Sequence, residues 1–259
     1  MSKGKLENKV AIVTGGASGI GAGICQEFAQ QGAQIVIADI NQAGAEQVCD
    51  EISQGGGNAL AVETNVTDPA SVGAAVGQVL NRYQTIDILI NCVGWNQLKP
   101  VEEYTTEDWE VIRSLNLDGP WHMSQAVLPT LINNRSGKIV NIASGSGILA
   151  QPHMAAYGSA KHGLIGMTKT FAVDLARYQI NVNCICPATI ATPLVMECTT
   201  EAYRSFQIER IPLGRLGHVS DIAKAALFLS SSDANWITGA ILPVDGGLTC
   251  CAVAQSIAT

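Results

Sequence analysis

The sequence predicts an α/β fold in which a parallel sheet of seven strands is covered by helices on both faces, a doubly wound three-layer αβα sandwich. Short runs rich in Val and Ile alternate with longer segments of helical periodicity along the whole chain. That alternation is typical of repeated βαβ units. The runs are also apolar throughout, as expected of strands that are buried on both faces.

Seven segments have the length and composition of such strands, namely residues 10–13, 34–38, 59–63, 86–90, 138–142, 181–186 and 240–244. Apolar residues recur at helical spacing over residues 106–133, and residues 155–178 form a second long helical stretch. The longest segment without a strand, residues 187–217, contains three prolines and is expected to form short helices that act as a substrate lid. No linker or internal repeat divides the chain, so residues 1–259 are expected to form one domain.

Composition and charge exclude several classes of protein. Hydrophobic residues make up 47% of the 259 residues and charged residues 14%, which excludes a disordered chain or a coiled coil. The net charge of -7 argues against nucleic-acid or anionic-membrane partners, because both require a basic face. Small molecules are therefore the expected partners.

Targeting and metal-binding patterns are also missing from the sequence. The first apolar run, residues 10–13, is too short for a signal peptide, and no stretch is apolar enough to span a bilayer. The eight cysteines contain no C-x-x-C pair and have no His at zinc-ligand spacing. A cytoplasmic protein with reduced thiols and no metal site is expected.

A glycine-rich loop follows the first strand directly and leads into a helical stretch over residues 22–31. Glycines in such a loop let the backbone turn tightly and approach a pyrophosphate, which then binds the free N–H groups at the start of the helix. The same order of strand, loop, helix and strand is typical of a Rossmann-type fold. The loop residues expected to contact the cofactor are Gly15, Ser18, Gly19, Ile20 and Gly21.

Asp39 ends the second strand, about 20 residues after the last glycine of the loop, which is the spacing of a carboxylate that binds the adenosine ribose. Residues 10–80 contain no Lys, Arg or His that would pair with a 2′-phosphate. The carboxylate would also repel that phosphate. NAD is therefore predicted as the cofactor in preference to NADP.

Tyr157 and Lys161 lie one helical turn apart in the stretch 155–178, and Ser144 follows the fifth strand at its carboxyl end. A nearby ammonium favours the phenolate form of tyrosine, which makes the tyrosine usable as a general base. The carboxyl ends of the strands are also where open α/β sheets bind their ligands. A Tyr and a Lys at this spacing are by themselves also common on exposed helix faces.

Several motifs in the expected order resemble the short-chain dehydrogenase/reductase family over nearly the whole chain. They are Thr14-Gly15 with Gly19 and Gly21, Asn91-Cys92-Val93-Gly94, Asn116, Ser144, Tyr157 with Lys161, Pro187 with Thr192, and Val244-Asp245-Gly246-Gly247. The compact length resembles that of the single-domain oxidoreductases of this family.

The resemblance implies a role for each catalytic residue. Tyr157 would be the acid/base, Lys161 would hold the nicotinamide ribose and support the phenolate, and Ser144 would bind the substrate oxygen. Asn116 would complete a water-linked proton relay. Further cofactor contacts are implied for Asn65, Val66, Asn91, Val93, Gly94, Tyr157, Lys161, Pro187, Thr189, Ile190 and Thr192.

Three positions depart from the common pattern of the family. Asn65 stands where an Asp often binds adenine, and its amide oxygen is expected to replace the carboxylate as an acceptor. Cys92-Val93 replaces Asn-Ala, and Ala188 adds a methyl group near the nicotinamide.

The expected activity is oxidation of a secondary alcohol by NAD, the alcohol being a cyclic or aryl alcohol or a β-hydroxyacyl thioester. Trp95, Gln151 and His153 are expected to line the substrate pocket. One alternative is a carbonyl reductase of the 3-oxoacyl carrier-protein reductase type, and another is a non-catalytic NAD-binding sensor. The resemblance also implies a homotetramer in which the two long helical stretches pack against their copies.

Overall fold

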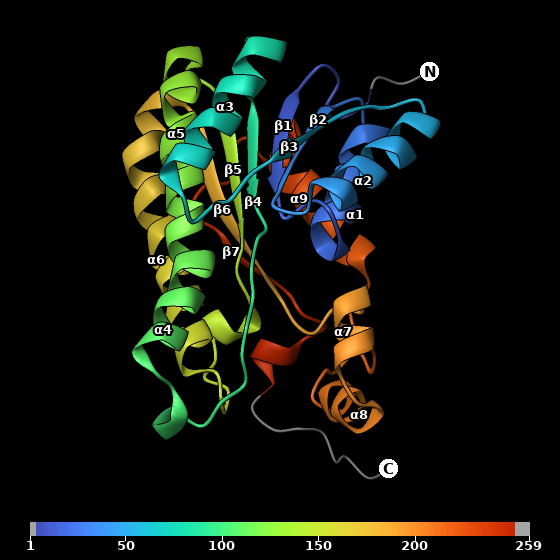
Figure 1. Ribbon diagram of the computed structural model, residues 1–259, viewed down its shortest axis with the longest axis vertical. Helices are drawn as coiled ribbons and strands as arrows, with labels where there is room; N and C mark the ends of the chain where they lie inside the picture. The colour runs from blue at the N-terminus through green and yellow to red at the C-terminus, as the bar shows by residue number, and fades with distance from the viewer. Residues whose placement is uncertain (1–3, 252–259) are drawn as a thin grey trace.

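A seven-stranded parallel sheet forms the centre of the computed structural model, which describes residues 4–251 (Figure 1). Its strands are β1 Val10–Thr14, β2 Gln34–Asp39, β3 Asn58–Glu63, β4 Ile88–Asn91, β5 Gly137–Ile142, β6 Ile180–Pro187 and β7 Ile241–Val244. Their order in the sheet is β3-β2-β1-β4-β5-β6-β7. The chain therefore winds outward from β1 to β3, crosses back to β4 and continues in the other direction. The predicted doubly wound fold is confirmed.

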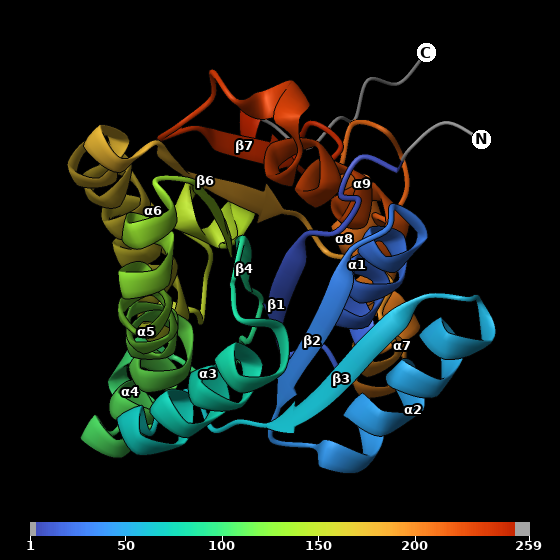
Figure 2. The ribbon, with the colours of Figure 1, turned by 90° about the horizontal axis from the view of Figure 1, so that it is seen from above.

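Helices cover both faces of this sheet, which Figure 2 shows from above. One layer contains α1 Gly19–Gln30, α2 Gln42–Gln54 and α9 Val219–Ser230; the other contains α3 Pro69–Tyr83, α4 Thr106–Arg113, α5 Gly119–Asn134 and α6 Ala155–Leu175. The short helices α7 Pro193–Cys198 and α8 Glu201–Glu209 lie within the predicted lid segment, at the lower end of the molecule in Figure 1. Within residues 4–251, every helix is too short or too polar to cross a membrane.

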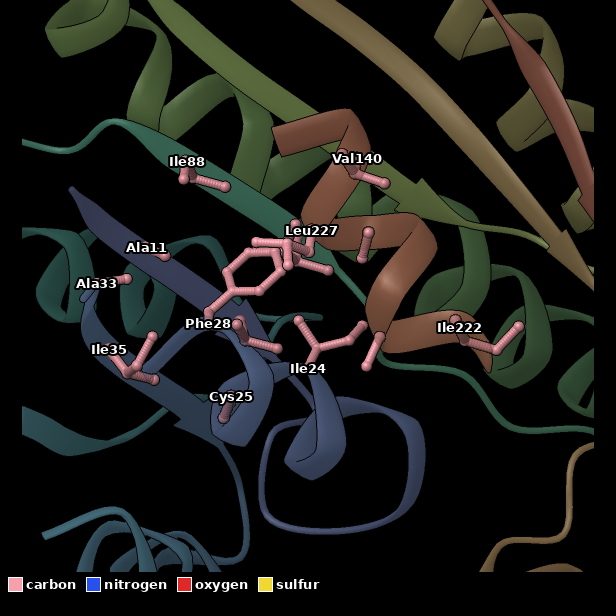
Figure 3. Packing of buried hydrophobic residues seen from close by; sticks show 14 of the residues in the cluster. Ala11, Ile24, Cys25, Phe28, Ala33, Ile35, Ile88, Val140, Ile222 and Leu227 are labelled. Atoms are coloured by element: carbon pink, nitrogen blue, oxygen red, sulfur yellow. The ribbon is translucent and has the colours of Figure 1, made fainter. Parts of the chain in front are cut away.

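The alternation of side chains along each strand divides the core between the two helical layers. On β1, Ala11 and Val13 pack with α1 and α9, whereas Val10 and Ile12 pack with α3, α5 and α6. Figure 3 shows Phe28 of α1 in the first of these clusters, between the sheet and α9. Full burial of such a side chain stabilises the fold by about 2 kcal/mol.

Thr14 joins the ends of β1 and β4, the two strands between which the winding direction reverses. Its hydroxyl accepts hydrogen bonds from the backbone N–H groups of Cys92 (2.9 Å) and Val93 (3.3 Å) and donates to the carbonyl of Ile90 (3.3 Å). Open α/β sheets bind ligands at this reversal point. The side chain of Thr14 therefore fixes the floor of the site described below.

The helical stretch predicted over residues 106–133 is interrupted. α4 ends at Arg113, a π-helical turn spans Ser114–Asp118, and α5 begins at Gly119. The apolar periodicity does not reveal the interruption, because the backbone stays helical and adds only a wider turn. Such turns are common at functional sites, and this one contains Asn116.

Candidate active site

A cavity of about 320 Å³ lies at the carboxyl ends of β1, β2 and β4. The sequence predicted eleven of its lining residues: Gly15, Ser18, Gly19, Ile20, Gly21, Asp39, Asn65, Val66, Val93, Gly94 and Thr192. It did not single out six others as cofactor contacts: Ile40, Thr64, Cys92, Leu115, Pro193 and Leu194. These six follow or flank predicted residues, so closeness in sequence to the motifs is the signal that would have found them.

The glycine-rich loop forms a cradle that larger residues would fill. A Cβ atom on Gly21 would lie 2.1 Å from the carbonyl oxygen of Gly15, and Gly15 itself has a φ of +68°. The Ser18 side chain does not cap α1, and the first turn of this helix contains no acidic residue. The N–H groups of that turn are therefore available to an anion. The cradle fits the pyrophosphate of a dinucleotide.

Asp39 places its carboxylate at the edge of the same cavity. One carboxylate oxygen accepts a hydrogen bond from the N–H of Ala17 (3.0 Å), and the other accepts from the N–H of Asn41 (2.9 Å). Each oxygen keeps a further lone pair for a ribose hydroxyl. Asp39 therefore supports the glycine-rich loop and also faces the position expected for the adenosine ribose. Ile40 beside it is 68% exposed.

Asn65 lines the cavity, but its amide oxygen is already engaged. The oxygen accepts from both the N–H (3.1 Å) and the hydroxyl (2.8 Å) of Thr67. The expectation that it accepts from adenine therefore needs these bonds to change. The neighbouring Val66 is held from α5, where His122 Nδ1 donates to the Val66 carbonyl at 3.1 Å. No local motif in the sequence indicates this role of His122, because 56 residues separate it from Val66.

A second cavity, of about 470 Å³, adjoins the first and shares Ile20, Cys92, Gly94, Thr192 and Leu194 with it. It brings together most of the remaining predicted residues, namely Trp95, Ser144, Gln151, Tyr157, Lys161, Pro187, Thr189 and Ile190. The predicted acid/base set and the nicotinamide end of the predicted cofactor site therefore lie in one space.

Within this cavity the Lys161 ammonium lies over the Tyr157 ring, 5.6 Å from the ring centroid. Lys161 is only 2% exposed, and its Nζ donates to the carbonyl of Ile142 at 3.0 Å. The hydroxyl of Ser144 accepts a hydrogen bond from the N–H of Ser146 at 3.1 Å. The backbone of the loop after β5 thus orients the serine, while α6 carries the other two residues.

Burial changes the pKa values of both α6 residues. It raises the pKa of the Tyr157 phenol, and the hydrogen bond with Ser144 counteracts this only in part. It lowers the pKa of Lys161 to about 8. The cation was expected to favour the phenolate, but burial raises the pKa of Tyr157 above its usual range, so the phenol is protonated at neutral pH.

Asn116 is fully buried below the cavity, and the amide nitrogen of its side chain donates to the carbonyls of Trp95 (2.7 Å) and Ile112 (2.8 Å). Its Oδ1 has no hydrogen-bond partner among the described residues. A Cβ on Gly94 would lie 3.0 Å from this oxygen and 3.3 Å from the Nζ of Lys161. The two polar groups therefore approach each other across Gly94, consistent with the expected relay.

Besides Asn116, two more predicted site residues lie outside both cavities. Asn91 is 1% exposed, and its amide nitrogen donates to Asn141 Oδ1 (2.8 Å) and to Ser124 Oγ (3.2 Å), so it ties β4 to β5 and α5. The side chain of His153 is exposed, and its carbonyl accepts from the N–H of Lys99 at 3.0 Å. Both positions are set by contacts distant in sequence, which the motif pattern does not reveal.

Replacing Lys161 by Met is expected to stabilise the protein at pH 7. Holding the ammonium in a site where its pKa is about 8, against 10.5 for an exposed lysine, costs about 3 kcal/mol. The substitution also removes the hydrogen bond from Lys161 Nζ to the Ile142 carbonyl, and this loss offsets about 1 kcal/mol of the gain in stability. We expect the free energy of unfolding, measured in urea at pH 7, to rise by about 2 kcal/mol.

The pH dependence separates this charge effect from packing. At pH 7 Lys161 is charged in the folded and unfolded protein alike, so the full cost of burying the ammonium applies. Between pH 8 and 10.5 Lys161 is neutral in the folded protein and still charged in the unfolded protein, and the cost of burial disappears over this interval. The advantage of Lys161→Met should therefore shrink as the pH rises through this interval. An advantage that is independent of pH would contradict the account.

Comparisons with known proteins agree with this geometry. Residues 15–249 match the family model described as "Enoyl-(Acyl carrier protein) reductase". The 3-oxoacyl-[acyl-carrier-protein] reductase FabG of Thermotoga maritima is 37% identical over 244 residues, covering 94% of this chain and 99% of that protein. The D-threitol dehydrogenase of Mycolicibacterium smegmatis is 37% identical over 245 residues, covering 95% of this chain and 94% of that protein.

A solved structure of a short-chain type dehydrogenase/reductase from Mycobacterium marinum has a TM-score of 0.91 and 31% identity, covering 95% of this chain and 97% of the other. A putative short-chain alcohol dehydrogenase from Sinorhizobium meliloti has a TM-score of 0.91 and 31% identity, covering 95% and 98%. The fold, the paired cavities and these relatives lead to one conclusion: the chain belongs to the short-chain dehydrogenase/reductase family and is an oxidoreductase.

Proposed function

We propose that the protein is an NAD-dependent dehydrogenase of secondary alcohols. The observation that carries the choice of cofactor is the carboxylate of Asp39 at the edge of the first cavity. None of the described residues that line this cavity is a Lys, Arg or His. A 2′-phosphate would meet a negative charge there and find no cation to pair with, whereas two ribose hydroxyls would find an acceptor.

The residues of the second cavity suit the removal of a proton from an alcohol. Bound NAD supplies the acceptor for the hydride that leaves the carbinol carbon. Ser144 holds the substrate oxygen. Tyr157 first gives up its own proton to the relay expected at Lys161 and Asn116, and the phenolate then accepts the hydroxyl proton as the carbonyl forms. Lys161 stabilises the phenolate by its charge. For ketone reduction the same groups act in reverse, with the protonated Tyr157 as the acid.

Reduction of a 3-oxoacyl thioester is the second candidate. Relatives named 3-oxoacyl-[acyl-carrier-protein] reductase are 37% identical to this chain, and that similarity favours it. The first cavity argues against NADPH as its electron donor, for the reason given above. A non-catalytic sensor is disfavoured, because it would have no use for the set of Ser144, Tyr157 and Lys161.

A panel of secondary alcohols assayed with NAD+ and with NADP+ tests the proposal, with the absorbance of the reduced nicotinamide as the readout. We expect NAD+ to give the higher kcat/KM by one to several orders of magnitude, on the order of 2 to 4 kcal/mol. Equal use of the two cofactors would contradict the role of Asp39. Activity limited to 3-oxoacyl thioesters would favour the second candidate.

We further propose a homotetramer in the cytosol, built through the outer faces of α4, α5 and α6. Four large apolar residues on these helices are exposed in the monomer, Trp109 at 42%, Val111 at 49%, Trp121 at 46% and Val173 at 77%. Exposed apolar surface of this kind is typical of subunit interfaces. Buried thiols such as Cys184 and Cys186 are typical of a reducing compartment.

Replacing Gly166 by Arg is expected to yield a smaller species with lower activity. Gly166 is exposed on α6, and a Cβ built there meets nothing within 4 Å, so the monomer itself has room for the new side chain. A second subunit packed on this face would leave no room for the arginine. Light scattering gives the mass of each species, and an active monomer of the unmodified protein would refute the proposed assembly.

A further inference from the structure

We propose that the substrate is an uncharged secondary alcohol with an apolar body and a second hydrogen-bonding group close to the reacting carbon, and that Asn96 recognises this second group. The inference rests on the proposed function and narrows its substrate class. It follows from the charges of the second cavity, from the unsatisfied amide of Asn96 and from the way its loop is held.

Apolar side chains make up much of the wall of the second cavity. Those that bear on substrate class are Trp95, Leu98, Met154, Leu194, Val195 and Leu248. Among the described lining residues there is no Asp, Glu or Arg, and the one Lys is Lys161 of the acid/base set. A carboxylate or phosphate on the substrate would lose its hydration there without gaining a partner. The cavity therefore selects against anionic substrates.

Arg204, on the lid helix α8, does not supply the missing charge. Its guanidinium donates to the carbonyl of Met196 at 3.2 Å, to the Thr199 hydroxyl at 3.3 Å and to the Thr199 carbonyl. These bonds satisfy groups at the end of α7, and the arginine is not among the residues that line the cavity. Arg204 therefore caps the C-terminal end of α7 and is not placed to bind a substrate anion.

Among the described polar residues that line the cavity, Asn96 is the one with a buried side-chain atom that lacks a hydrogen-bond partner. It lines the cavity, its Oδ1 is buried without a hydrogen-bond partner, and its amide makes no hydrogen bond with the described residues. Buried polar groups are normally paired, so an unpaired amide beside a cavity calls for a ligand that pairs with it. A hydroxyl or a neutral amide on the substrate provides both a donor and an acceptor.

The backbone on either side of Asn96 is fixed. The carbonyl of Trp95 accepts from the buried Asn116 side chain at 2.7 Å, and the carbonyl of Gln97 accepts from the Tyr104 hydroxyl at 2.5 Å. The backbone that carries the amide is thus pre-organised, which lowers the entropic cost of binding a partner. Asn96 is two residues from Gly94, where a Cβ would lie 3.3 Å from Lys161 Nζ, and two residues span at most about 7 Å, so the Asn96 backbone lies near the acid/base set.

The far end of the same loop is fixed as well. The N–H of Lys99 donates to the carbonyl of His153 at 3.0 Å, and the Lys99 ammonium pairs with Asp108 at 2.6 Å. His153 adopts a φ of +62°, a strained conformation for a residue other than glycine. The hydrogen bond between Lys99 and His153 connects the two loops that form walls of the cavity.

Four aryl alcohols that share one skeleton test the inference with NAD+. The pair 1-phenylethanol and 1-phenyl-1,2-ethanediol differs by the second hydroxyl, and the pair mandelamide and mandelate differs by the charge. We expect kcat/KM for the diol to exceed that for 1-phenylethanol by at least about tenfold. Mandelamide should exceed mandelate by at least about 100-fold. Chromatography confirms oxidation of the diol at its secondary carbon.

Asn96→Leu identifies the residue responsible. It should lower the ratio of kcat/KM for the diol to that for 1-phenylethanol to near one, whereas Asn81→Leu, on the exposed face of α3, should leave the ratio unchanged. A circular dichroism melt of each variant checks that it folds. A ratio unaffected by Asn96→Leu in a folded protein would overturn the role of Asn96, and oxidation of mandelate at the rate of mandelamide would overturn the exclusion of anions.

The outcomes also separate this inference from the proposed function. Oxidation of 1-phenylethanol without a preference for the diol would leave an NAD-dependent alcohol dehydrogenase standing and refute the recognition of a second group. No oxidation of any of the four compounds, with 3-oxoacyl thioesters reduced instead, would refute both.

Discussion

Tyr157→Phe should abolish turnover while leaving NAD binding nearly intact. The substitution removes the group that accepts the substrate proton and keeps the ring over which the Lys161 ammonium lies at 5.6 Å. Loss of a general acid/base costs at least ~10²-fold in kcat. The loss should appear in kcat with little change in the dissociation constant for NAD, which calorimetry measures directly.

Tyr203→Phe is the matched control, because Tyr203 lines the same cavity from α8 and its hydroxyl makes no hydrogen bond with the described residues. We expect it to retain more than about a tenth of the parent rate, since a binding contact is worth about tenfold or less. Retention of that much activity by Tyr157→Phe itself would show that another group transfers the proton.

The sheet was predictable because burial on both faces leaves a direct trace in the sequence. All seven apolar runs became strands, and the sheet is parallel throughout. Boundaries were less certain: Ile86 is fully buried, yet β4 begins only at Ile88. Apolar character reports exclusion from water, whereas a strand boundary depends on backbone pairing with neighbours elsewhere in the chain.

The site was predictable where a motif is local and unpredictable where contacts are distant. Gly15 to Gly21 and Asp39 belong to one βαβ unit, so spacing alone placed them around one cavity. His153 and Asn91 took structural positions instead, because Lys99 and Asn141 reach them from other loops and strands.

The direction of the Tyr157 pKa shift was also not predictable from the sequence, because the spacing to Lys161 reveals the nearby cation but not how deeply the phenol is buried. The same limit applies to Asn96. Its unpaired amide, and the hydrogen bond from the Tyr104 hydroxyl to the adjacent Gln97 carbonyl, depend on the folded loop and leave no pattern in the sequence.

Asp39→Ala combined with Ile40→Arg should transfer preference from NAD+ to NADP+. The first change removes the carboxylate that would repel a 2′-phosphate, and the second supplies a guanidinium able to bind it through two hydrogen bonds. Ile40 lines the first cavity and is 68% exposed, so the guanidinium of an arginine there stays hydrated in the free protein and carries no desolvation cost.

The expected result is a change of at least about 10³-fold in the ratio of kcat/KM for NAD+ to that for NADP+, or about 4 kcal/mol. Part of the loss with NAD+ comes from the loop, because the Asp39 carboxylate also accepts from the N–H groups of Ala17 and Asn41. Asp39→Asn removes the charge and keeps one acceptor oxygen, but its amide nitrogen cannot accept from the second N–H group. If Asp39→Asn raises the use of NADP+ relative to NAD+, charge repulsion sets the preference. If the double variant still prefers NAD+ by more than about tenfold, cofactor choice lies elsewhere in the cavity.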